Sequence, residues 1–99
     1  MDWKIHSYEL HTDAQTEIAL DQAARVLSCL YYPPTETIQL YVFEPLRNAG
    51  GRRGPPYDVR RFVALSTGAA IQVSAVARHL LIGTVFAGTD ARHVFEILQ

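Results

Sequence analysis

The sequence predicts one α+β domain over residues 1–99, in which about five mostly antiparallel strands pack against two helices on one face. Three observations lead to this prediction. Apolar residues recur at helical spacing through 12–31, a cleanly alternating segment follows at 37–43, and 99 residues suffice for one domain but not for two. Hydrophobic residues make up 48% and charged residues 19%, which excludes a largely disordered chain.

The first part of the chain is expected to form a strand and then a long helix. Residues 3–10 mix aromatic, β-branched and polar side chains, as a first strand does. Thr12 and Gln15 have the spacing of a capping box, and apolar residues then follow one helical face as far as Tyr31. Pro33 prevents the helix from continuing.

Later segments predict two hairpins and a second helix. Residues 37–43 and 59–65 are expected to be strands joined by a long glycine-rich connection. Residues 69–81 fit both a helix and a strand, and their length and alanine content favour the helix. Residues 82–87 and 93–98 are expected to form a final hairpin. The order β-α-β-β-α-β-β contains a ferredoxin-like arrangement with one added strand and leaves one sheet face open.

Residues 45–61, here called the arginine segment, interrupt these patterns. The segment holds three glycines, three prolines and five of the eight arginines, namely Arg47, Arg52, Arg53, Arg60 and Arg61. Arginine offers a planar fork of donors to phosphate or carboxylate, and glycine lets backbone amides approach an anion. With Tyr57 and Phe62, the segment is the predicted binding site for an anionic partner. Its glycine spacing matches neither a P-loop nor a dinucleotide site.

Charge is distributed unevenly along the chain. Residues 1–46 hold seven acidic against two basic side chains, a net charge of −5, whereas residues 47–99 hold seven arginines against three acids, a net charge of +4. Complementary halves favour either pairing within the chain or association with a second copy. The arginine segment is therefore a site for a foreign anion or for another subunit.

Single-stranded nucleic acid is an alternative partner. Aromatic side chains on an open sheet face can stack on bases while a basic loop holds the phosphates, and Tyr41, Phe43, Tyr57 and Phe62 are the candidates for stacking. The sequence around Phe62 lacks the glycine and the second aromatic residue of an RNA-recognition motif. A net charge of −1 also argues against a dedicated nucleic-acid binder.

No catalytic, metal-binding or cofactor-binding pattern is found in the sequence. Cys29 is the only cysteine, and the four histidines are not spaced as local metal ligands. A third hypothesis, a small enzyme or metabolite-sensing domain, would require an apolar pocket with an ionisable residue inside it.

The sequence thus predicts a non-enzymatic domain that forms homo-oligomers through a sheet edge or a helix face. Its arginine segment is expected to engage nucleic acid, an acidic membrane surface or an acidic protein, including a second copy. A small viral or phage accessory or assembly protein would fit this description. We expect a cytoplasmic or otherwise intracellular protein, because residues 1–4 lack the features of a secretory signal and no uncharged run reaches the roughly 20 residues of a membrane span.

Overall fold

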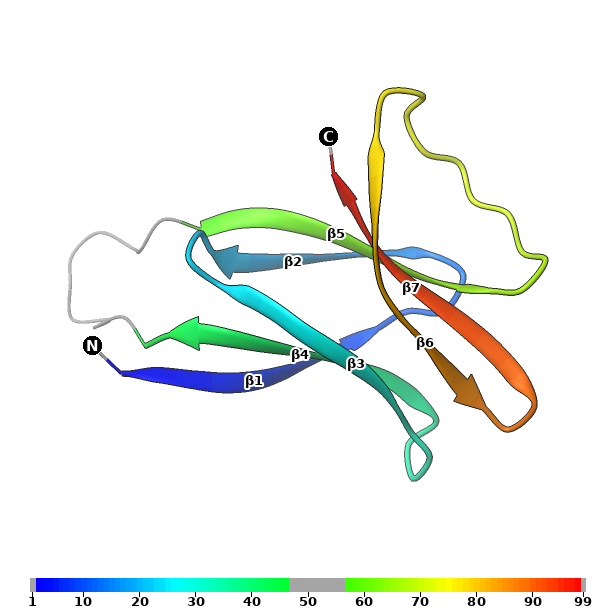
Figure 1. The fold of residues 1–99 in the computed structure, drawn as a ribbon, viewed down its shortest axis with the longest axis horizontal. Coiled ribbons are helices and arrows are strands. Elements are labelled where there is room, and N and C mark those ends of the chain that lie inside the picture. The colour runs from blue at the N-terminus through cyan, green and yellow to red at the C-terminus, as the bar shows by residue number, and fades with distance from the viewer. Residues whose placement is uncertain (1, 47–56, 99) are drawn as a thin grey trace.

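The computed structural model describes residues 2–46 and 57–98, and these residues form seven β-strands and no helix. The strands are β1 (Trp3–Leu10), β2 (Gln15–Asp21), β3 (Arg25–Tyr32), β4 (Thr37–Pro45), β5 (Tyr57–Ser66), β6 (Arg78–Ala87) and β7 (Asp90–Leu98). They make two antiparallel sheets (Figure 1): sheet A has the order β1-β4-β3, and sheet B has the order β2-β5-β7-β6. The predicted α+β class is therefore wrong, and the protein is all-β.

The inner faces of the two sheets share one hydrophobic core, as in a β-sandwich. Along β4 buried and half-buried side chains alternate, so that Leu40 and Val42 face inward. Phe62 on β5 and Val94 on β7 join the same cluster from sheet B, and all four side chains are fully enclosed. Burial of these side chains is the main stabilising contribution to the fold.

The predicted helix over 12–31 is wrong because these residues form β2, a tight turn and β3. On β2 every second side chain is buried as far as Leu20, which is the period of a strand. The chain then reverses at Asp21. Its carboxylate accepts a hydrogen bond from the Ala23 amide at 2.8 Å, and its carbonyl accepts one from the Ala24 amide at 2.9 Å. An aspartate that bonds its own backbone in this way favours a turn over a helix.

The predicted helix over 69–81 is also wrong, and the ferredoxin-like arrangement fails with it. Residues 67–77, here called the strap, have no regular structure, and β6 begins only after them. In Figure 1 the strap arches between the end of β5 and the start of β6. Ile71 and Val73 are half-buried while Gln72 between them is exposed, because the strap lies over the outer face of sheet B. Tertiary packing has overridden the helix propensity of the alanines.

The five strands predicted from the sequence lie within β1, β4, β5, β6 and β7. The final hairpin is confirmed, since β6 and β7 pair through a turn in which Gly88 has a φ of +66°. The other predicted hairpin is wrong. β4 lies in sheet A and β5 in sheet B, so the arginine segment joins the two sheets instead of two paired strands.

The four edge strands, β1 and β3 in sheet A and β2 and β6 in sheet B, differ in how regularly they pair with their neighbours. β3 and β6 each carry a register shift, between Val26 and Ser28 and between Leu81 and Gly83. β1 and β2 pair with their single neighbours without interruption. Bulges are a common means of blunting a sheet edge, and β1 and β2 are the two edge strands without one.

Cys29 lies where β3 approaches β6. A Cβ atom on Gly83 would come within 3.3 Å of the Cys29 Sγ atom, so the glycine permits the close contact. Burial raises the pKa of the Cys29 thiol. The thiol is therefore neutral at physiological pH and packs as a small apolar group.

Candidate functional site

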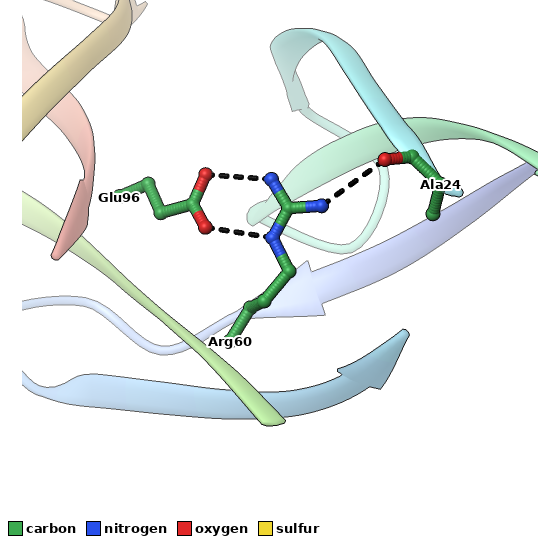
Figure 2. Close-up of polar contacts among 3 residues, drawn as sticks. All are labelled: Ala24, Arg60 and Glu96. Carbon is green, nitrogen blue, oxygen red and sulfur yellow. Dashed lines mark hydrogen bonds and ion pairs between the residues drawn. The ribbon is translucent and has the colours of Figure 1, made fainter. Parts of the chain in front are cut away.

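Arg60 makes a two-point ion pair with a carboxylate, and this partner lies within the same chain. It projects from β5 between the sheets, where its Nε and Nη2 atoms each donate a hydrogen bond of 2.7 Å to one carboxylate oxygen of Glu96 on β7. Its Nη1 atom donates to the Ala24 carbonyl oxygen at 3.2 Å. Figure 2 shows the guanidinium held between these two partners. All three guanidinium nitrogens are thus engaged within the domain.

The surroundings of this ion pair are largely shielded from water. The Glu96 side chain is 4% exposed and the Arg60 side chain 24%. The guanidinium also lies 5.8 Å from the centre of the Phe62 ring, a cation–π distance. The hydrogen bonds to Glu96 raise the pKa of Arg60 above its ordinary value. In this position Arg60 closes one edge of the core, and each of its three guanidinium nitrogens already donates a hydrogen bond within the domain.

Arg61 points to the opposite face of β5 and makes a weaker pair. Its Nε atom donates to the Glu17 carboxylate at 2.9 Å, directly across the β2–β5 register. Both side chains are exposed, so this pair contributes little to stability. Glu17 belongs to the acidic first half, whereas the partner of Arg60 belongs to the second half.

The seven residues of the predicted site are not gathered on one surface. Arg47, Arg52 and Arg53 lie outside the described residues. Tyr57 is exposed at the start of β5, and Phe62 is fully buried in the core. Arg60 and Arg61 lie on opposite faces of sheet B. Phe62 is therefore not presented to a partner in this structure.

A polar cluster that the sequence patterns did not indicate lies between β1 and β4. The Tyr8 hydroxyl donates a hydrogen bond to the buried carboxylate of Glu44, and His6 Nδ1 lies 2.9 Å from the same oxygen. Burial, together with the hydrogen bond to Glu44, raises the pKa of the Tyr8 phenol. The cluster satisfies a buried carboxylate. His6 and Tyr8 are two residues apart on β1, and the β1–β4 register places Glu44 opposite Lys4, on the same side of sheet A as both of them.

The outer face of sheet A is rich in aromatic and aliphatic side chains and is not covered by any other strand or loop among residues 2–46 and 57–98. We call this surface the aromatic face. It comprises Trp3 and Ile5 on β1, Tyr41 and Phe43 on β4, and Leu30 and Tyr32 on β3. The Trp3 and Phe43 rings are in contact, with centroids 4.9 Å apart. Four of its six side chains, Trp3, Ile5, Leu30 and Tyr32, are exposed. An apolar face of this kind on a small domain is a candidate interface.

Two oppositely charged side chains stand at opposite corners of the aromatic face. Glu9 lies on β1 opposite Gln39, and Arg25 lies on β3 opposite Phe43. Both are exposed, and neither makes an ion pair with another residue that the structure describes.

Two other polar residues, His93 and Asp13, make hydrogen bonds to residues of sheet B. His93 contacts the hydroxyls of Thr67 and Thr84 at 2.8 and 3.0 Å. Asp13 has a φ of +56° and accepts hydrogen bonds from the Ser66 amide and hydroxyl; the backbone bond lowers the pKa of Asp13. Within residues 2–46 and 57–98, no group of three acidic, histidine or cysteine side chains is placed to hold a metal ion.

Fold and surfaces together define a small all-β sandwich domain with an internal arginine–glutamate pair and an uncovered aromatic sheet face. No helix that could cross a membrane is present in the described part of the chain. The chain belongs to the family described as Domain of unknown function (DUF7352), whose model matches residues 1–99. Neither a curated protein nor a solved structure was found to match the chain.

Proposed function

We propose that this protein is a non-enzymatic binding and assembly domain that pairs with a second copy of itself through the aromatic face. The observation that supports the proposal most directly is the exposure of four large side chains on one side of sheet A, whose other side is the core. Packing two such faces together would remove them from water, which is the dominant favourable contribution in protein association.

Charge complementarity favours a second copy as the partner. Because Glu9 and Arg25 occupy diagonally opposite corners, a two-fold axis in the plane of contact brings each Arg25 over the Glu9 of the other copy. The same operation forms both ion pairs at once. The face carries one positive and one negative side chain, which supplies little attraction for the phosphates of a nucleic acid.

Reversing these charges tests the two-fold contact. Arg25→Glu and Glu9→Arg are each expected to weaken self-association about tenfold, because like charges would then meet at both corners. The double variant restores opposite charges and is expected to recover most of the affinity. Sedimentation equilibrium at low salt measures all three. A parent protein that is monomeric at every accessible concentration, or a double variant weaker than either single variant, would overturn the proposal.

A matched pair of apolar substitutions serves as the control for that experiment. Ile5 on the aromatic face is 56% exposed, and Val59 on the outer face of sheet B is 55% exposed. Ile5→Glu should reduce association, whereas Val59→Glu should leave it unchanged. Equal effects of both would show that the contact is not made by the aromatic face.

The second part of the proposal is that the arginine segment engages an anionic partner. Arg60 and Arg61 have carboxylate partners within the domain, which assigns this role to Arg47, Arg52 and Arg53.

The proposal also places the protein inside the cell. Its lone cysteine supports that location, because small extracellular domains commonly depend on disulfides.

Replacing Arg52 and Arg53 together by alanine is expected to weaken binding of an anionic probe about tenfold at low salt, since each arginine supplies one phosphate or carboxylate contact. The probes are a labelled single-stranded oligonucleotide, vesicles containing phosphatidylserine, and the second copy itself, measured by fluorescence anisotropy, vesicle co-sedimentation and sedimentation equilibrium. The probe that loses affinity identifies the class of partner. Arg61→Ala is the control. Unchanged behaviour with all three probes would remove the arginine segment from the proposal.

A further inference from the structure

A cavity of about 480 Å³ lies between the strap and the outer face of sheet B, on the side of the molecule away from the aromatic face. Most of its lining is apolar: Val63, Leu65, Ala69, Ala70, Ile71, Val73, Phe95 and Ile97 line it, together with His79. The volume falls within the roughly 300–1,000 Å³ typical of small-molecule sites. The cavity is half-open, so a ligand can enter it from solvent.

The strap that forms one wall is held mainly by its side chains. Its backbone hydrogen bonds lie at the two ends, from Ala69 to Ser66, from Ala77 to Ser74 and from Thr67 to Ala91. Its middle, residues 70–74, makes no backbone hydrogen bond to the sheet residues that the structure describes. The strap can therefore adjust over a bound molecule without breaking the sheet.

His79 is the single titratable side chain in the lining. Its ring meets Phe95 edge-on, with centroids 6.4 Å apart, and it makes no hydrogen bond to another described residue. It stands on β6 opposite Ile97, at the border between the apolar floor and solvent. Its ring nitrogens are thus available to donate to a ligand whose apolar part fills the cavity.

We propose that this cavity binds a small, mainly hydrocarbon molecule with a single carboxylate, of the size of a medium-chain fatty acid. The chain packs against Val63, Phe95 and Ile97, and the carboxylate accepts a hydrogen bond from His79. The lining of this cavity shares no residue with the aromatic face or the arginine segment, so its success or failure does not depend on the proposed assembly function.

Isothermal titration calorimetry with decanoate and decan-1-ol, below the micellar range of decanoate, tests the proposal. Decanoate is expected to bind at least tenfold more tightly than decan-1-ol. His79→Gln should bring decanoate binding down to the decan-1-ol level and leave the alcohol unaffected. Absence of decanoate binding would overturn the site, and equal affinities of the two ligands would overturn the carboxylate contact.

A filling substitution and a matched control locate the binding. Ala70→Trp places a large ring in the cavity and is expected to lower decanoate affinity more than tenfold. Ala75→Trp lies on the same strap outside the lining and should have no effect. Both positions are exposed, and a circular dichroism spectrum like that of the parent confirms folding. Parent-like binding by Ala70→Trp would show that the ligand lies elsewhere and overturn the assignment.

Discussion

Replacing Glu96 by leucine is expected to lower the free energy of unfolding by about 3 kcal/mol, because Arg60 would keep its charge at the edge of the core with one carbonyl as its partner. Urea unfolding followed by circular dichroism measures the change. The value is near the lower end for buried pairs because part of the Arg60 side chain reaches solvent.

Two further variants complete the experiment. The double variant Arg60→Met with Glu96→Leu removes both charges and should recover most of the lost stability, since packed apolar groups often replace a buried pair at little cost. Arg61→Ala breaks the exposed pair with Glu17 and should cost less than about 1 kcal/mol. If Glu96→Leu cost no more than Arg61→Ala, the pair between the sheets would not be a structural element.

Replacing Phe62 by alanine is expected to lower the free energy of unfolding by about 3–5 kcal/mol, because the ring is 0% exposed and its removal leaves a cavity between the two sheets. A domain of this size has a total stability of about 5–15 kcal/mol, so the loss is a large fraction of it. The unfolding midpoint in urea reports the change directly.

Tyr57→Ala is the matched control, because Tyr57 is an exposed aromatic residue on the same strand. Its cost should stay within about 0.5 kcal/mol, as for most surface substitutions. The comparison also bears on nucleic-acid binding. Loss of oligonucleotide binding by Phe62→Ala would follow from unfolding, whereas loss in Tyr57→Ala, which remains folded, would indicate a contact. A cost below about 1 kcal/mol for Phe62→Ala would contradict the observed core.

The strands were predictable where alternation was clean. Residues 37–43 alternate, and the structure places Ile38, Leu40 and Val42 in the core and Tyr41 and Phe43 on the outer face. This one strand therefore indicated both the core and the open face. Its pattern was sufficient because each side of sheet A meets a different environment.

The helix over 12–31 was mispredicted because two patterns overlap in that stretch. Leu20 belongs both to the helical stripe and to the buried set of β2, and alanines after it extend the helical spacing. In the structure the turn at Asp21 separates β2 from β3. A turn aspartate also suits a helix surface, so only the pairing of β2 with β5 decides between the two structures.

The partners of the arginines could not be deduced from composition. Pairing between the acidic first half and the basic second half was one of the interpretations that the charge asymmetry allowed, and the ion pair between Arg61 and Glu17 agrees with it. Arg60 instead pairs with Glu96, 36 residues away on a strand of the same sheet. The net charge of a segment does not say which of its residues face each other. An ion pair depends on the register of the strands, and the register is fixed only when the sheets form.

The order of strands in the two sheets also determines how the chain can reach this structure. Only β3 with β4 and β6 with β7 are paired neighbours in sequence; β1 must find β4, and β2 must find β5. The two hairpins can close in microseconds, whereas the distant pairings carry the entropy of long loops and place such topologies among the slower folders, in the millisecond to second range. During synthesis, β1 and β2 are made well before their partners β4 and β5. The two edge strands without a bulge are therefore the ones that remain unpaired longest.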